Sequence, residues 1–277
     1  MAFKTILVHI DNDESCKYRL DAGIRLALEF QAQLVGIYLV PGSGLTPSVA
    51  AMLPPDVVQQ RFAEFGDAQY AAEDMFRKSA AAAGLASIDW RAPAGSHVDA
   101  GVAHGRCTDL FITGQRNPSG SMFAEELVTS VTLSSGRPTL VVPYIGARPV
   151  LGENVLIAWD GGRAASRAIG DAMLFLERAK RVTVVTVRTH ADEDVAEHLA
   201  GARLAAWLLQ HGVEIQLVRH DAPDIPTGQW LLSRAADLGS DLIVMGAYGH
   251  ARMRELVLGG VTQTMLKAMT VPVFMSH

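Results

Sequence analysis

The chain has 277 residues, of which 49% are hydrophobic and 19% charged, with a formal net charge of −5. This length suggests two ordinary domains, and this composition is typical of a protein that buries a large core. The acidic balance without a lysine or arginine block argues against a nucleic-acid partner, and the lack of a leader or long apolar run argues against a membrane partner, so we expect a cytoplasmic protein.

The first half alternates apolar strands with helices. Strands are predicted at 4–11, 33–39, 87–90, 108–114 and 137–142. The first strand ends in Asp11, and a helix is predicted from about Ser15. A proline-rich stretch at 41–60 precedes a further helix through Phe62, Tyr70 and Phe76.

The second half repeats these landmarks in the same order. Its strands are predicted at 154–160, 182–187, 213–218, 240–246 and 271–276. The first of them ends in Asp160, and a helix is predicted from about Ser166 to Leu176. The repeat therefore predicts two domains, 1–147 and 152–277, joined by a short linker rich in turn residues.

Strands that alternate with helices form βαβ units with right-handed crossovers. The predicted fold class is therefore α/β, with two doubly wound, Rossmann-like domains that each have a parallel sheet covered by helices on both faces. Ligands of such sheets bind at the carboxyl ends of the strands, where the strand order reverses.

Four glycines of the second half form the pattern G-x2-G-x9-G-G, made by Gly246, Gly249, Gly259 and Gly260. A helix is predicted to follow from Val261. Glycines let a ligand approach the backbone, and a helix N-terminus offers N–H groups, so the pattern suits a phosphate. The alternative is that these are ordinary turn and cap glycines, and the spacing by itself leaves both open.

No catalytic or metal-binding constellation is evident. The nine histidines show no metal-ligand spacing, and His250, although it follows Gly249, is interpreted as an exposed loop histidine. Cys16 and Cys107 lie far apart without a CxxC pattern, so both are expected to be reduced.

Each half resembles the universal stress protein domain, and the whole chain resembles a tandem universal stress protein. The resemblance rests on the apolar strand that ends in aspartate, the Asp-Leu strand that ends in glycine, the glycine pattern, and a closing strand introduced by proline. It implies five-stranded parallel sheets of order 3-2-1-4-5. It also implies that ATP lies across the ends of strands 1 and 4 and that the two domains pack as a pseudo-two-fold pair.

The resemblance carries over to individual residues of the second half. It implies that Asp160 contacts adenine and that the backbone of Val187 meets the base, while the phosphates lie on Gly246, Gly249 and Gly259. The family pattern continues with Ser or Thr, whereas this chain has Gly260, followed by Val261 and Thr262 at the helix start. Thr262 could replace the missing hydroxyl in part, and Mg²⁺ could accompany the phosphates.

The first half departs further from the pattern. Asn117 stands in place of the second glycine, and nothing from 118 to 135 matches the Gly259-Gly260 pair. We therefore expect no nucleotide in the first half, where Asp11 would cap a turn or the next helix.

Three functions remain open. The favoured one is a stress-response protein that binds ATP or a related adenine nucleotide as a regulatory ligand and acts on an unknown protein partner. The others are a slow nucleotide hydrolase and a ligand-free interaction scaffold. Whether two chains form a homodimer is left open.

Overall fold

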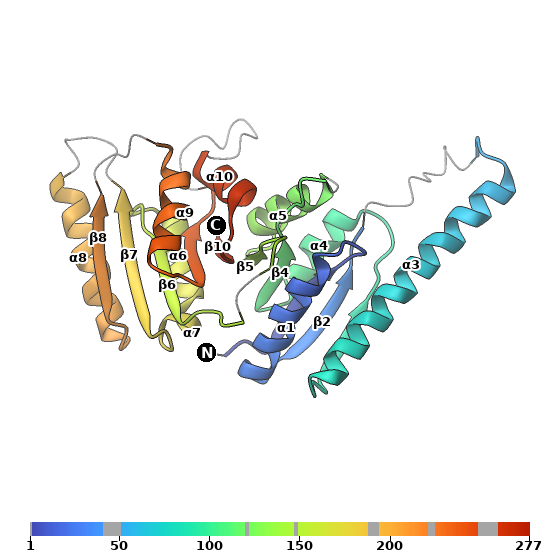
Figure 1. Cartoon of the computed structure of the whole chain (residues 1–277), viewed down its shortest axis with the longest axis horizontal. Coiled ribbons are helices and arrows are strands. Elements are labelled where there is room, and N and C mark those ends of the chain that lie inside the picture. The colour runs from blue at the N-terminus through green and yellow to red at the C-terminus, as the bar shows by residue number, and fades with distance from the viewer. Residues whose placement is uncertain are drawn as a thin grey trace. The chain divides into compact units, whose positions relative to one another are not determined.

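The computed structural model describes residues 2–40, 51–119, 122–146, 149–187, 194–220, 225–248 and 260–277 (Figure 1). The chain divides into two compact units, Ala2–Arg137 (the first unit) and Pro138–His277 (the second unit). Both have an α/β fold with a mostly parallel sheet, as predicted. The sequence-derived domain limits 1–147 and 152–277 stay a prediction.

In the first unit, four parallel strands have the order β3-β2-β1-β4. β1 pairs with β2 along its whole length, from Thr5 opposite Gln33 to Ile10 opposite Tyr38. The strands and helices are β1 (Thr5–Ile10), α1 (Cys16–Phe30), β2 (Gln33–Tyr38), α3 (Pro55–Ala82), β3 (Ile88–Arg91), α4 (His97–Gly105), β4 (Leu110–Gly114) and α5 (Phe123–Ser134).

One part of the core of the first unit lies between the sheet and α5. Leu7, Val35 and Phe111 come from three neighbouring strands and are fully buried against Leu127 and Val131 of α5. Such continuous apolar strands are expected where both faces of a parallel sheet are covered. This packing therefore holds the strands of the sheet against α5. The ends of the strands lie at the edge of the sheet.

Helix α3 is long, but only its C-terminal part is anchored. Ala72, Phe76 and Ala80 are buried, whereas residues 55–71 contain no buried side chain. Figure 1 shows the N-terminal part of α3 extending away from the strands of its unit. Among the described helices, none is long and apolar enough to cross a membrane.

In the second unit, the strand order is β5-β10-β9-β6-β7-β8, and every neighbouring pair is parallel except β5 with β10. The order of β6 to β10 is thus the predicted 3-2-1-4-5. The elements are β5 (Thr139–Val142), β6 (Asn154–Ala158), α6 (Arg163–Asp171), α7 (Met173–Leu176), β7 (Arg181–Val187), α8 (Asp194–Gln210), β8 (Ile215–His220), α9 (Thr227–Asp237), β9 (Leu242–Gly246), α10 (Gly260–Ala268) and β10 (Val273–Ser276).

The strands predicted to close each half pair directly with one another. Leu140 of β5 lies opposite Phe274 of β10 in an antiparallel register, and both side chains are fully buried. This pairing explains why β5 belongs to the same compact unit as β10. The packing of the two halves as a pseudo-two-fold pair stays a prediction.

One helix prediction was wrong in its limits. A single helix was expected from about Ser166 to Leu176, but α6 begins at Arg163 and a turn at Ala172 separates it from α7. The early start has a local cause, because Gly161 adopts a φ of 73° and Gly162 is extended, which turns the chain directly into the helix.

The aspartate before the β4 and β9 strands has a structural role in both units. The Asp109 carboxylate accepts hydrogen bonds from the Lys4 and Thr5 N–H groups, at 2.7 and 2.9 Å. Asp241 likewise accepts from the N–H groups of Gly152, Glu153 and Asn154, at 2.7, 3.1 and 3.0 Å. Each carboxylate thus holds the start of the neighbouring strand at the amino edge of the sheet. Open α/β sheets in general bind ligands at the opposite, carboxyl edge.

Candidate functional site

The candidate site lies at the carboxyl edge of the second unit, where the strand order reverses. β6 lies between β7 and β9, so the chain continues from β6 to one side and later returns on the other. In Figure 1 the arrowheads of β7 and β8 mark this edge at the top of the unit. Crevices at such switch points bind ligands in open α/β sheets.

Asp160 forms the turn that leads from β6 into α6. The Trp159 N–H donates to the Val185 carbonyl at 2.9 Å, which continues the ladder one residue beyond β6. The Asp160 Oδ1 then accepts a hydrogen bond from the Gly162 N–H at 2.8 Å. Asp160 is exposed, so its position at the open edge agrees with the predicted contact to a base, although its turn role would exist without a ligand.

Val187 is the last residue of β7, and its backbone lies opposite His220 of β8. β6 and β7 are paired in register from Asn154 and Arg181 onward. The Val187 backbone therefore reaches the same edge as Asp160, as the predicted site requires.

Gly246 has a packing role of its own. A Cβ at this position would overlap the Ala165 backbone nitrogen and come within 2.7 Å of the Ala164 carbonyl carbon. Because α6 starts directly against the end of β9, only glycine fits there. The glycine is thus required by the fold whether or not a phosphate lies beside it.

Gly260 and Thr262 differ in their environment. Gly260 is the exposed first residue of α10, its φ lies outside the left-handed region, and a Cβ there would meet no atom of the described residues within 4 Å. Thr262 is buried, and its Oγ1 accepts a hydrogen bond from the Tyr248 N–H at 3.4 Å. Thr262 therefore ties the start of α10 to the residues after β9, and Val261 beside it is half-buried. The predicted site residues Gly249 and Gly259 lie outside the described residues.

The two units differ in the charge at the helix that follows their fourth strand. The first turn of α10 contains no acidic residue, whereas the first turn of α5 contains Glu125 and Glu126. A helix N-terminus attracts an anion, and acidic side chains there repel one. The second unit is therefore the more suitable of the two for a phosphate.

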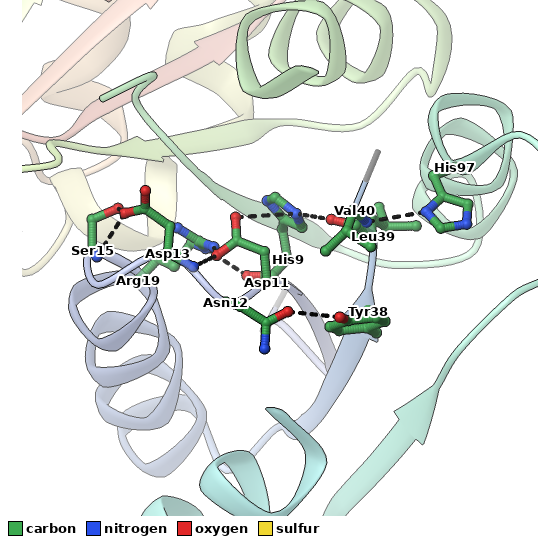
Figure 2. Close-up of polar contacts among 10 residues, drawn as sticks. All are labelled: His9, Asp11, Asn12, Asp13, Ser15, Arg19, Tyr38, Leu39, Val40 and His97. Carbon is green, nitrogen blue, oxygen red and sulfur yellow. Dashed lines mark hydrogen bonds and ion pairs between the residues drawn. The ribbon is translucent and has the colours of Figure 1, made fainter. Parts of the chain in front are cut away.

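The predicted base contacts of the second unit are Asp160 and the Val187 backbone. In the first unit, the residues equivalent to them already form contacts with other side chains of the protein. Strand register makes Asp11 equivalent to Asp160 and Leu39 equivalent to Val187. The Arg19 guanidinium forms an ion pair with Asp11, and the His9 imidazole lies 2.6 Å from the Leu39 carbonyl oxygen through Nε2 (Figure 2). Asp11 also accepts from the Asp13 N–H at 3.0 Å, so the predicted turn-capping role is confirmed.

The second unit lacks both of these side chains. Ala158 occupies the strand position equivalent to His9, and Ser166 is the fourth residue of α6, as Arg19 is of α1. Figure 2 shows His9 between Asp11 and Leu39, and an alanine at the His9 position is too short to make these contacts. The carboxyl edge of the second unit therefore lacks the His9 and Arg19 contacts that occupy the same edge of the first unit.

Burial and charge set the protonation states in this cluster. Burial lowers the pKa of His9 to about 4, helped by the Arg19 charge, so the imidazole is neutral at pH 7. Burial by itself would raise the pKa of Asp11, but the Arg19 charge, together with hydrogen bonds from Arg19 and the Asp13 N–H, holds that pKa below its usual value. Asp11 and Arg19 therefore form a charged pair beside a neutral histidine.

His9 and Arg19 were not singled out from the sequence as site residues. Arg19 belongs to the buried side of α1, with Cys16, Leu20 and Gly23 as buried neighbours, and it donates through Nε to the His9 carbonyl at 2.6 Å. An arginine among apolar helix positions is the signal that could have identified it, because arginine is rarely buried unless it is paired. In the part of the chain that the structure describes, no three His, Cys, Asp or Glu side chains are grouped to hold a metal ion.

Comparison with known proteins assigns the second half to a family. Residues 152–277 match the model of the universal stress protein family. A universal stress protein of Synechocystis sp. is 25% identical over 173 residues, which make up 60% of this chain and 56% of that protein. The chain thus matches just over half of the length of this relative.

Solved structures extend the likeness to both units. A universal stress protein from Archaeoglobus fulgidus has a TM-score of 0.74 at 16% identity, with 98% of this chain and 97% of that chain covered. A functionally unknown protein from Pseudomonas aeruginosa has a TM-score of 0.59 at 17% identity, with coverages of 99% and 92%. Residues 152–277 therefore match the universal stress protein family, and the shared fold spans the whole chain.

Proposed function

We propose that the chain is a tandem universal stress protein whose second unit binds one ATP or related adenine nucleotide as a regulatory ligand. The observation that carries the proposal is that Asp160 and the open N-terminus of α10 belong to the same carboxyl edge, on either side of the switch between β6 and β9. The base would lie near Asp160 and the Val187 backbone, and the phosphates near the glycine-rich segment and α10.

The residues at the phosphate end fit such a ligand. Among the described residues, no atom lies within 4 Å of a Cβ at Gly260, and the first turn of α10 has no acidic side chain that would repel phosphate. Mg²⁺ bound to the phosphates would supply further neutralising charge. Protein groups would orient the nucleotide, which would stabilise one state of the second unit and thereby change its contacts with a protein partner.

Native mass spectrometry and calorimetry of the purified protein test this proposal. One adenine nucleotide per chain, found either bound after purification or by titration with ATP, is the expected result. Two equivalent sites per chain would contradict the assignment to the second unit, and the absence of any binding would support the ligand-free scaffold. A phosphate-release assay on the same samples separates a regulatory ligand from a slowly hydrolysed substrate.

A further inference from the structure

The first unit contains a cavity of about 230 Å³ at its carboxyl edge. Residues that follow β1, β2 and β4 line it, together with the start of α5. Its volume is below the roughly 300–1,000 Å³ of sites for drug-sized ligands, so only a small molecule would fit. The nucleotide pattern is absent from this unit, so the cavity requires its own chemical interpretation.

His9 lines this cavity, and its ring carries a buried acceptor. The Leu39 carbonyl can only accept, so the His9 Nε2, 2.6 Å away, must carry the hydrogen. The neutral ring therefore has a lone pair on Nδ1, and this atom is buried without a hydrogen-bond partner among the described residues. His9 is only 1% exposed, so water at the surface does not satisfy it. An unsatisfied buried acceptor is costly, and a donor on a ligand would remove that cost.

The charges around the cavity favour a cation. Asp11 is neutralised by Arg19, but Asp13 adds a second carboxylate. The Asp13 Oδ1 accepts from the Ser15 N–H at 2.8 Å and from the Ser15 hydroxyl at 2.6 Å, which fixes the carboxylate at the rim (Figure 2). The lining thus has an excess of one negative charge. Glu126 at the start of α5 adds to the repulsion of an anion, whereas Glu125 is paired with Arg116 at 3.9 Å.

The other wall of the cavity is apolar. Leu39, Val40, Phe123 and Ala124 line it, and the Phe123 ring lies edge-on to His9 with 6.2 Å between the ring centroids. A ligand that fits both walls has a short hydrocarbon part and a hydrogen-bond donor with positive charge. An aromatic ring beside the cavity also favours a cation through its π electrons.

We propose that the first unit binds a small organic ammonium ion in this cavity, with the ammonium group toward His9 Nδ1 and Asp13 and the hydrocarbon part against Val40 and Phe123. This site is separate from the nucleotide site of the second unit. The units would then bind ligands of opposite charge at equivalent edges of similar folds.

Calorimetry with three probes of similar size tests the charge requirement. n-Butylammonium should bind to the full-length protein at one site per chain, with a dissociation constant on the order of millimolar for so few atoms. n-Butanol and n-butyrate, at the same ionic strength, should bind at least tenfold more weakly. Equal binding of butanol, tighter binding of butyrate, or no binding of the ammonium ion would each overturn the proposal.

Two carboxylate variants separate the site from general attraction to an acidic protein. Asp13→Asn keeps the shape and an acceptor for Ser15, and it should weaken n-butylammonium binding about tenfold. Asp21→Asn removes an exposed carboxylate from the same unit, with 66% of that side chain accessible, and should leave the binding unchanged. Equal effects of the two variants would show non-specific attraction and reject the site.

A spectroscopic signal identifies the acceptor. The ¹⁵N resonance of His9 Nδ1 should move upfield when n-butylammonium is added, because a lone pair that accepts a hydrogen bond is more shielded. The Gly259→Val variant, which alters the nucleotide site, should show the same movement, so a failure of one site remains distinguishable from a failure of the other. An unchanged Nδ1 resonance at saturating ligand would refute the proposed orientation.

Discussion

Arg19, in the first turn of α1, forms an ion pair with Asp11, the residue that follows β1, and their side chains are 3% and 19% exposed. The same guanidinium donates through Nε to the His9 carbonyl at 2.6 Å. Gly114 makes room for it, because a Cβ at that position would lie 2.9 Å from an Arg19 terminal nitrogen. The pair therefore joins the turn after β1 to the end of β4.

We expect Arg19→Met to destabilise the first unit by about 3–5 kcal/mol, because it leaves the Asp11 carboxylate buried without a cation. Urea unfolding measures this change through the fluorescence of Trp90, in a background in which Trp159, Trp207 and Trp230 are replaced by Phe. Arg25→Met is the matched control on α1, since its ion pair with Asp21 is exposed and should cost less than about 1 kcal/mol. If the two variants lost the same free energy of unfolding, the buried ion pair of Arg19 would stabilise the first unit no more than an exposed ion pair does.

The stability of the first unit should depend on pH through His9. The pKa of His9 is lowered to about 4 in the folded protein from 6.5, so the unfolded chain binds the proton more readily. The stabilisation is complete above about pH 6.5 and is lost as the pH falls toward 4, by up to about 3 kcal/mol. His9→Asn should flatten this part of the stability curve.

The same unfolding assay at several pH values from 7 to 4 compares wild type with His9→Asn. His211→Gln changes an exposed histidine of the second unit and serves as the control. A wild-type curve no steeper than that of His9→Asn between pH 6.5 and 4 would rule out the predicted linkage.

Two glycines of the predicted phosphate motif should respond differently to alanine. Gly246→Ala should destabilise the second unit by at least about 1–3 kcal/mol, because the new methyl group overlaps the α6 backbone. Gly260→Ala should be neutral or stabilising by up to about 1 kcal/mol, since its Cβ meets open space in a helix. Thermal unfolding without nucleotide measures both, and a harmless Gly246→Ala would contradict the packing role.

Nucleotide affinity should change in opposite directions at the neighbouring glycines. Gly259→Val should abolish measurable ATP binding, because a side chain there pushes the phosphates away from the backbone amides. Gly260→Ser should strengthen binding by about 1 kcal/mol by adding a hydroxyl, and the described residues leave room for its Cβ.

Calorimetry with ATP tests this pair of variants. Gly66→Ala, on the exposed side of α3, is the control because a Cβ there also meets nothing. If neither Gly259→Val nor Gly260→Ser alters the affinity for ATP, the glycine-rich segment is purely structural and the nucleotide assignment fails.

Asp241 should be more important for stability than an exposed carboxylate of the same unit. Asp241→Ala removes the acceptor of three backbone N–H groups at the start of β6 and should cost about 3 kcal/mol. Asp237→Ala, at the exposed end of α9, should cost less than about 1 kcal/mol. Chemical unfolding of the two variants decides the matter, and similar midpoints would disprove the proposed role of Asp241.

The sequence by itself determined the strands, their alternation with helices and the internal repeat. Apolar runs such as Leu242 to Met245 specify a strand buried on both faces, and the aspartate that ends the first strand of each half marks the turn into a helix. Asp11 confirms this, because its carboxylate accepts from the backbone two residues on. These features were predictable because they depend on residues close together in the chain.

The tertiary structure decided which side chains meet across elements. His9 reaches the Leu39 carbonyl, Arg19 pairs with Asp11 beside Gly114, and Thr262 turns its hydroxyl to the Tyr248 amide. It also gave Gly246 a packing role that the motif alone could not distinguish from phosphate binding. Such contacts depend on how closely a helix packs against a strand end, which is a distance of a few ångströms set by side-chain volumes far apart in the chain, and no local pattern of residues encodes it.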